Sequence, residues 1–152
     1  MSTAWDAIAI GERHDFGAYD FTAERIKDFA RQFDPQPFHV DEAAAAQSVF
    51  GGLIASGWHT AAVATRLYVD YFAARAGRGD PVPRFGVSPG VDNLKWLKPV
   101  FAGDRISYSG TVSAKRLSQS RPGWGLVAFD FAGENQNGEP VFAMTGHVFV
   151  AV

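Results

Sequence analysis

The sequence predicts an α+β domain in which an antiparallel sheet curls around one long helix. Apolar residues recur at helical spacing through the first half of the chain, and the period changes to two after residue 84. Helices followed by a run of strands are typical of the α+β class. The longest predicted helix is apolar over most of its circumference, and such a helix is normally enclosed by other structure. A sheet of four or five strands encloses it only by curling around it.

The composition is that of one globular domain spanning residues 1–152. Hydrophobic residues make up 47%, charged residues make up 20%, and the net charge is -2, so the charge indicates neither nucleic acid nor a membrane as a partner. Cysteine is absent, which excludes disulfides, thiolate catalysis and cysteine-bound metal. Residues 1–6 form neither a basic nor an apolar run, so we expect no signal peptide and a cytoplasmic protein.

The first predicted helix begins after Phe21, and residues 5–20 before it predict irregular structure or a short edge strand. Thr22 can cap this helix, whose apolar positions recur at spacings of three and four. Pro35 ends it, because the residue before a proline is pushed out of the helical region. Asp34 therefore lies just beyond a helix end. The apolar face is formed by Ile26, Phe29, Ala30 and Phe33.

Two prolines make residues 34–38 an extended, restrained connection. Residues 41–46 then predict a short helix with acids in its first turn, where the helix dipole favours them. After a glycine pair, one long helix is predicted over residues 56–76, roughly 30 Å in length. Its broad apolar face contains Trp58, Ala61, Ala62, Thr65, Val69 and Phe72.

A loop dense in glycine and proline, residues 77–84, separates the helices from the strands. Beyond it, apolar residues alternate with their neighbours in four segments, and turns that contain glycine lie between them. Short strands at this spacing form an antiparallel sheet. The alternating segments lie around residues 94–96, 106–112, 127–131 and 142–150.

Asp34 and His39 are the first candidates for chemistry. A carboxylate can hold and deprotonate a water, and an imidazole can accept or return a proton near neutral pH. Five fully extended residues would separate them by roughly 15 Å, so they share one water only if the segment turns. We expect such a turn, because His39 stands just before the helix predicted at 41–46. Either residue fits either proton transfer.

The start of the long helix is the second candidate. Ser56 and Gly57 stand where unpaired backbone N–H groups and the helix dipole point at an incoming oxygen. An amide at this position can polarise a thioester carbonyl and stabilise an enolate as it forms. The two candidates together supply the groups that activate a water and hold a carbonyl oxygen.

Three segments resemble a known family. Residues 34–39, Asp-Pro-Gln-Pro-Phe-His, resemble the Asp-x-Asn-Pro-x-His signature of the MaoC-like dehydratases and (R)-specific enoyl-CoA hydratases. Residues 50–57 are similar to the segment that begins that family's long helix. Residues 98–104 resemble the turn that leads into one of its strands. The resemblance covers residues 10–150, nearly the whole chain.

This resemblance implies the hotdog fold, a curled antiparallel sheet around a long central helix, and a homodimer or higher homo-oligomer. It implies addition of water to a trans-2-enoyl thioester, or the reverse dehydration of a 3-hydroxyacyl thioester. The substrate would be an acyl-CoA or an acyl-carrier thioester. No metal and no cofactor are expected, since coenzyme A enters only as part of the substrate.

Carried over by position, Asp34 and His39 match the family's catalytic pair, and Gly57 matches the glycine whose amide faces the thioester oxygen. Two positions depart from the family. The motif's Asn is replaced by Gln36, and Ser56 stands where His is common, so both departures bear on substrate preference. The residues expected to contact the substrate are Gln36, Phe38, Ser56 and Trp58.

Two alternative functions are compatible with the same fold. A hotdog thioesterase needs a carboxylate on the long helix aimed at the carbonyl carbon, and Asp70 is the candidate, although it lies at the far end of that helix. A non-catalytic domain that binds acyl thioesters or serves as an assembly partner is the other, and the two departures from the motif keep it open. His59 is interpreted as a packed helix residue. His14 and His147 fall on separate elements, which argues against a metal site.

Overall fold

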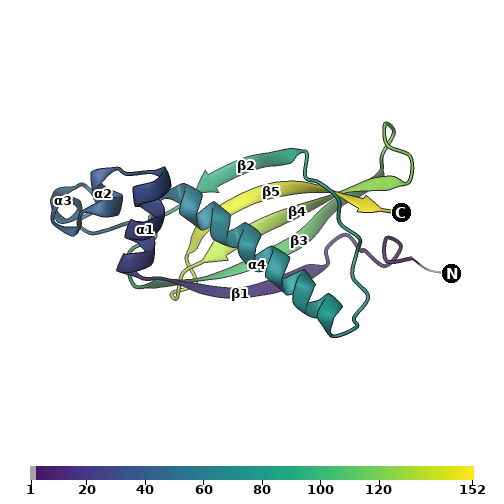
Figure 1. Cartoon of the computed structure of the whole chain (residues 1–152), viewed down its shortest axis with the longest axis horizontal. Helices are drawn as coiled ribbons and strands as arrows, with labels where there is room; N and C mark the ends of the chain where they lie inside the picture. Colours follow the sequence, from purple (N-terminus) through teal and green to yellow (C-terminus); the bar gives the residue numbers. More distant parts are fainter. Residues whose placement is uncertain (1–2) are drawn as a thin grey trace.

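The computed structural model describes residues 3–152 and contains one five-stranded antiparallel sheet with a long helix lying across it (Figure 1). The strands follow the order β1-β3-β4-β5-β2 across the sheet. This arrangement confirms the predicted α+β class and the hotdog fold. The strands are β1 (Arg13–Phe21), β2 (Gly90–Trp96), β3 (Asp104–Leu117), β4 (Trp124–Glu134) and β5 (Pro140–Ala151).

The two edges of the sheet, β1 and β2, are the strands that the sequence pattern defined least well. β1 is bent by a bulge between Asp15 and Gly17, and the φ angle of 98° at Gly17 is one that favours glycine. β2 begins at Gly90, ahead of the segment around 94–96 that the alternation predicted. Nearly all side chains of β2 are exposed in the single chain, so its residues carry no clear two-residue period.

The longest helices, α1 (Ala23–Phe33) and α4 (Gly57–Gly77), lie where the periodicity predicted them. Thr22 caps α1, because its Oγ1 accepts a hydrogen bond from the Arg25 N–H at 3.2 Å. Ser56 caps α4 in the same way and accepts from the Trp58 N–H at 3.2 Å. Both caps satisfy donors that a helix start leaves without partners.

The connection between α1 and α4 differs from the prediction. Residues 34–38 were expected to be extended, but Pro37 and Phe38 belong to the helix α2 (Pro37–Val40), which begins directly after the extended Gln36. Proline is favourable at a first helical position, since its missing N–H has no helical partner there anyway. A further short helix, α3 (Glu42–Gln47), follows, close to the predicted range.

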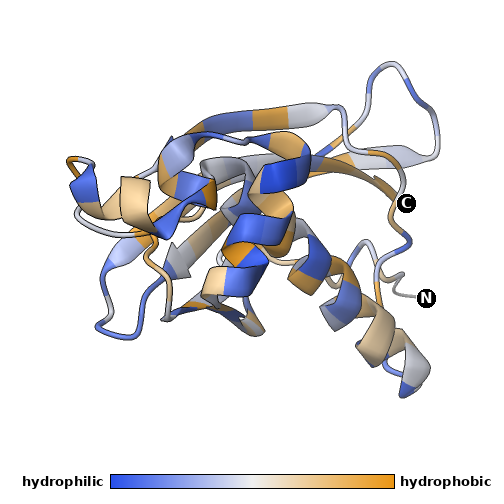
Figure 2. Cartoon of the chain, turned by 60° about the vertical axis from the view of Figure 1, so that its left-hand side comes forward, coloured by the Kyte–Doolittle hydropathy of each residue, from blue (hydrophilic) through white to orange (hydrophobic). Residues whose placement is uncertain are grey.

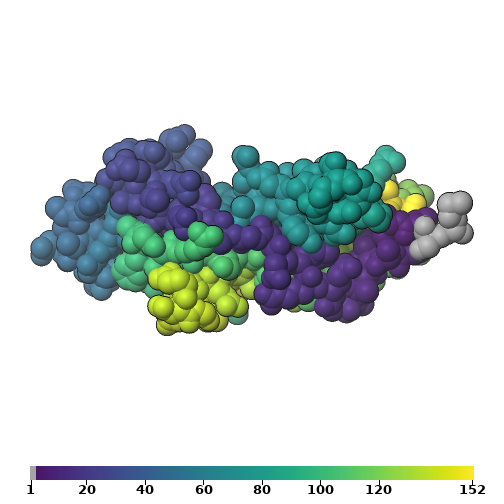
Figure 3. Space-filling view, turned by 90° about the horizontal axis from the view of Figure 1, so that it is seen from below, coloured from purple at the N-terminus to yellow at the C-terminus, as the bar shows by residue number. Residues whose placement is uncertain are grey.

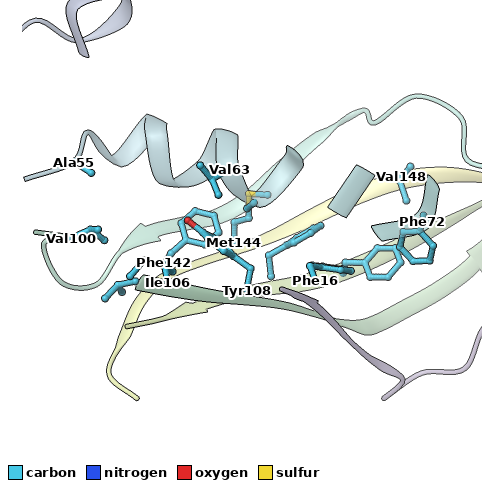
Figure 4. Packing of buried hydrophobic residues seen from close by; sticks show 14 of the residues in the cluster. Phe16, Ala55, Val63, Phe72, Val100, Ile106, Tyr108, Phe142, Met144 and Val148 are labelled. Atoms are coloured by element: carbon cyan, nitrogen blue, oxygen red, sulfur yellow. The ribbon is translucent and has the colours of Figure 1, made fainter. Parts of the chain in front are cut away.

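One face of α4 packs on the sheet and forms the core. Val63 of α4 lies above apolar side chains of β3 and β5, and Figure 4 shows this layer. The buried Tyr108 hydroxyl donates to the Thr60 carbonyl at 2.9 Å and so ties β3 to α4. The labelled core residues on the strands are Phe16, Ile106, Tyr108, Phe142, Met144 and Val148.

The opposite face of α4 is uncovered, which corrects the expectation of a helix enclosed on most sides. Trp58 is 56% exposed and Val69 is 51% exposed. The sheet of one chain covers only one side of the helix, and Figure 2 shows both polar and apolar residues along α4. The single chain therefore leaves apolar helix surface open to solvent.

The helices divide between the two ends of an elongated molecule. Figure 3 shows α1, α2 and α3 gathered at one end, with the last turns of α4 and the N-terminal segment at the other. The start of α4 thus lies beside the short helices, where the segments that carry the family resemblance meet (Figure 1). Within residues 3–152, no helix is both long enough and apolar enough to cross a membrane.

Candidate active site

The N-terminal end of α4 is held in place by backbone hydrogen bonds from two other segments. The Ala55 N–H donates to the Val100 carbonyl at 2.8 Å, which joins the segment before α4 to the turn before β3. The Ile54 N–H donates to the Phe38 carbonyl at 3.1 Å, which joins the same segment to α2. The three segments that resemble the MaoC-like family are therefore in contact, although up to 60 residues separate them in the chain.

Asp34 and His39 are brought together by the turn that α2 makes. Asp34 is the C-terminal cap of α1, and its N–H donates to the Ala30 carbonyl at 2.8 Å. The His39 N–H donates to the Gln36 carbonyl at 2.9 Å, which closes the first turn. As a result, His39 Nε2 lies 3.4 Å from Asp34 Oδ2, and the turn expected from the sequence is present.

The hydrogen bond at the other ring nitrogen fixes which nitrogen of a neutral His39 ring carries the proton. His39 Nδ1 lies 2.6 Å from the Ile54 carbonyl oxygen, which can only accept, so Nδ1 carries the proton. In the neutral ring, Nε2 is then an acceptor. It faces another acceptor, the Asp34 carboxylate, so neither can donate to the other. A water that lies beside the pair, within reach of both atoms, can donate one hydrogen to each.

The Asp34 carboxylate is held at both oxygens. Gln36 Nε2 donates to Oδ1 at 2.7 Å, and Ser56 Oγ donates to Oδ2 at 2.6 Å. Burial raises the pKa of Asp34, but the hydrogen bonds from Ser56 and Gln36 outweigh it, with a smaller contribution from His39 when its ring is charged, and the pKa lies below its ordinary value. Asp34 is therefore a carboxylate at neutral pH.

Gly57 offers an unused backbone donor at the start of α4. As the first helical residue it has no helical acceptor, and no other acceptor for its N–H lies within residues 3–152. The indole of Trp96 lies so close to Gly57 that a Cβ at this position would overlap the ring. Position 57 therefore requires glycine for close packing, and the Trp96 indole lies beside the free amide.

A cavity of about 240 Å³ brings His39 and Gly57 to one surface. It lies between the start of α4, the end of β2 and the turn before β3. Most of its wall is apolar, with few polar groups, as in many small-molecule sites. The wall is formed by His39, Phe50, Ile54, Ala55, Gly57, Thr60, Trp96, Leu97, Lys98, Pro99, Val100 and Val141.

The four residues expected to contact substrate lie around this cavity without lining it. Gln36 and Ser56 are bonded to the Asp34 carboxylate instead. Phe38 packs on Phe50, with ring centroids 5.5 Å apart. Trp58 is exposed and packs edge-on against Trp96, with centroids 5.2 Å apart.

Sequence reasoning missed two residues of this site. Ile54 acts through its backbone carbonyl, which any residue type supplies, so the sequence holds no signal for it. Trp96 was recognised only as a strand residue, because its contact with Gly57 depends on where β2 crosses the start of α4. An exposed tryptophan at a strand end was the available signal.

The remaining titratable residues lie outside this cavity. His59 is buried and stacks on Phe29, with ring centroids 4.6 Å apart, as expected for a packed helix residue. Asp70 pairs with Arg66 on the exposed surface at 2.8 Å, so it is not aimed at the cavity. Across residues 3–152, no group of three or more acidic, histidine or cysteine side chains is placed to hold a metal ion.

The fold and the position of the site define a hotdog protein with a polar pair beside the start of its central helix. The family model for the MaoC like domain matches residues 7–123, and the chain belongs to this family. It is 30% identical to the protein YdeM of Bacillus subtilis over 101 aligned residues. The aligned region covers 66% of this chain and 67% of YdeM.

Solved structures agree with this assignment. A MaoC-like dehydratase from Rhodospirillum rubrum is 40% identical, with a TM-score of 0.80 over 95% of this chain and 93% of that one. An (R)-hydratase from A. caviae is 22% identical, with a TM-score of 0.62 over 93% of this chain and 96% of that one. At that identity, the second similarity shows the hotdog fold alone.

Proposed function

We propose that the protein is a hydro-lyase that adds water to a trans-2-enoyl thioester or removes it from a 3-hydroxyacyl thioester. The observation that carries the proposal is the placement of His39 Nε2 3.4 Å from Asp34 Oδ2, while Nδ1 is bonded to the Ile54 carbonyl. His39 lines the same cavity as the free Gly57 amide. The membership of the chain in the MaoC-like family and its similarity to a MaoC-like dehydratase support the same reaction class.

The tautomer of His39 supports one assignment of the proton transfers that the sequence left open. A water held beside the pair donates one hydrogen to Asp34 and the other to His39 Nε2. As its oxygen bonds to C3, the O–H bond breaks, and Nε2 takes the proton. Asp34 stays ionised, orients the water and stabilises the imidazolium. The imidazolium then returns a proton to C2.

The Gly57 amide stabilises the negative charge that forms on the thioester after water adds to C3 and before C2 is protonated. When the oxygen adds to C3, the π electrons of the double bond move toward the thioester, and its oxygen becomes an enolate oxygen. A free N–H at the positive end of α4 stabilises that oxygen more than it stabilises the uncharged carbonyl. No cofactor is needed, because every bond change is a proton transfer or an addition.

The active form is proposed to be a homodimer or larger homo-oligomer in the cytoplasm that binds acyl-CoA or an acyl-carrier thioester. The uncovered face of α4 and the exposed edge strand β2 support assembly with a second copy. Trp58 and Val69 on α4, and Val91 and Trp96 on β2, place half-exposed apolar side chains there. Patches of this kind mark interaction surfaces.

The test is the absorbance of the enoyl-thioester band with purified protein and crotonyl-CoA, and with crotonyl thioesters on an acyl carrier protein. Asp34→Asn is the comparison. We expect loss of absorbance with the wild type, no release of thiol, and a rate about 100- to 10,000-fold lower in the variant. Full activity in Asp34→Asn would overturn the mechanism.

The alternatives predict different products in the same assay. A thioesterase would release thiol from a saturated acyl-CoA, and the position of Asp70 on the solvent face of α4 argues against that function. A binding domain would show saturable acyl-thioester binding with no turnover for any chain length or carrier, and that result would overturn the hydro-lyase proposal.

A further inference from the structure

We propose that Ser56 is a positioning residue for Asp34 rather than a contact for the substrate. Its hydroxyl donates to Asp34 Oδ2 at 2.6 Å, and Oδ2 is the oxygen that faces His39. This inference rests on the proposed function, because it assigns Ser56 a part in holding the water-binding carboxylate. It also accounts for a serine at the position where the family commonly has histidine.

The hydrogen bonds of Ser56 leave no donor for a ligand. A serine hydroxyl has one proton, and Asp34 receives it. The hydroxyl oxygen also accepts from the Trp58 N–H, the bond by which it caps α4. Ser56 is thus bonded on one side to the carboxylate and on the other to the helix that presents the Gly57 amide. One side chain fixes the two halves of the site relative to each other.

The two donors to Asp34 differ in their surroundings, and the difference decides which one matters more. Ser56 has no exposed surface, whereas Gln36 is exposed. Water can replace the amide of Gln36 at Oδ1 with little loss. Removal of the Ser56 hydroxyl leaves a mostly buried carboxylate oxygen without its donor, which costs far more than loss of a solvated bond.

The charge state of Asp34 provides the readout. His39 is the titratable group that faces Asp34, and Ser56 and Gln36 are its uncharged donors. Burial alone would raise the pKa of Asp34, and the Ser56 hydrogen bond opposes that effect. A variant without the hydroxyl should therefore titrate Asp34 at higher pH. A hydrogen bond to a charged group is worth enough to move a titration by about one to two pH units.

Three variants at Ser56 and one control at Thr22 separate the positioning of Asp34 from the capping of α4. Ser56→Ala and Ser56→Gly both remove the hydroxyl, but glycine is the better N-cap of the two, so they differ in stability. Ser56→Thr retains a hydroxyl. Thr22→Ala removes the cap of α1 without touching Asp34 and is the matched control. For each protein, the carboxyl carbon of Asp34 is titrated by NMR, and the pH profile of kcat/KM for hydration is recorded.

We expect Ser56→Ala and Ser56→Gly to shift the Asp34 titration and the acidic limb of the profile upward together, by about one to two pH units. Gln36→Ala should shift them less, Ser56→Thr should restore both, and Thr22→Ala should move neither. An unchanged Asp34 titration in both hydroxyl-free variants would overturn the inference. If the wild type hydrates no thioester, the proposed function fails, but the NMR titration still decides the role of Ser56.

Discussion

At the scale of single residues, the contact between Asp34 and His39 is unfavourable when the His39 ring is neutral. Two acceptors face each other at 3.4 Å, and one of them is a mostly buried carboxylate. A structure selected only for stability would place a donor at one of the two positions. Sites that bind a reacting molecule often retain such unfavourable contacts, because the missing donor is supplied by the ligand. In the proposed mechanism, the missing donor is the reacting water.

We therefore expect Asp34→Asn to separate activity from stability. With its NH2 at the position of Oδ2, the Asn amide can donate to His39 Nε2 and still accept from Gln36, but it no longer accepts from Ser56. The gain and the loss oppose each other, so the thermal midpoint should change little while hydration is lost. Differential scanning calorimetry beside the absorbance assay checks this. Asp70→Asn, which removes an exposed carboxylate, should leave both values nearly unchanged. A large fall in the midpoint of Asp34→Asn would contradict the argument.

His59 should make the stability of the protein depend on pH. Burial and then the nearby Arg25 lower the pKa of His59 to about 4, from an ordinary value of 6.5. The unfolded chain binds this proton below pH 6.5, and the folded protein does not until about pH 4. The free energy of unfolding should thus be highest above pH 6.5 and should fall by roughly 3 kcal/mol as the pH decreases toward 4.

Urea unfolding between pH 8 and pH 4 measures this effect. In His59→Phe, which retains a ring against Phe29, most of the loss of stability across that range should disappear. His147→Phe is the control, since His147 is partly exposed and hydrogen-bonds Asp92 at 2.7 Å. Equal pH dependence in His59→Phe and the wild type would show that His59 is not the group responsible.

At the scale of elements, local sequence signals predicted α1 and α4, whereas contacts between distant elements created the site. Caps and three-to-four spacing were sufficient for the two helices. α2 was missed because the two prolines favour an extended chain before each of them, and four residues carry no period. The Asp34–His39 pair was predictable from its motif. The roles of the Ile54 carbonyl and of the contact between Trp96 and Gly57 were not predictable, since both depend on tertiary packing.

The contact between α4 and β2 can be tested at Gly57. In Gly57→Ala, the new Cβ overlaps the Trp96 indole, and the half-exposed indole should move rather than the helix. We expect hydration to fall by about tenfold or more, because the wall beside the amide is displaced. In the double variant Gly57→Ala/Trp96→Ala, the overlap is absent. A double-mutant cycle should then give a non-zero coupling free energy, and simple additivity would refute the contact.

At the scale of the whole molecule, the exposed apolar face of α4 and the unpaired edge of β2 lie on neighbouring surfaces. Trp58 of α4 packs on Trp96 of β2, so the two exposed regions adjoin at the cavity. An unpaired edge strand with apolar side chains readily pairs with a second strand. Assembly would therefore close the solvent side of the cavity and the edge of the sheet at once.

Val91→Lys tests this at the edge of β2, where the side chain is 49% exposed. A lysine there should not affect the fold of one chain, but it should weaken pairing between copies. We expect a lower mass in sedimentation velocity and a parallel loss of hydration activity. Leu117→Lys, at an exposed position on β3, should change neither. A wild type that sediments as a monomer with full activity would contradict the proposed assembly.

The packing of the Trp96 indole beside Gly57 has a spectroscopic consequence. Two of the four tryptophans of the chain, Trp58 and Trp96, stand edge to face, and Trp96 lies beside the Gly57 amide that is proposed to bind the thioester oxygen. An acyl group that enters must displace water from these indoles, and their emission should shift to shorter wavelength as it does so. The fluorescence of the protein would then report occupancy of the cavity before any bond to the substrate is made.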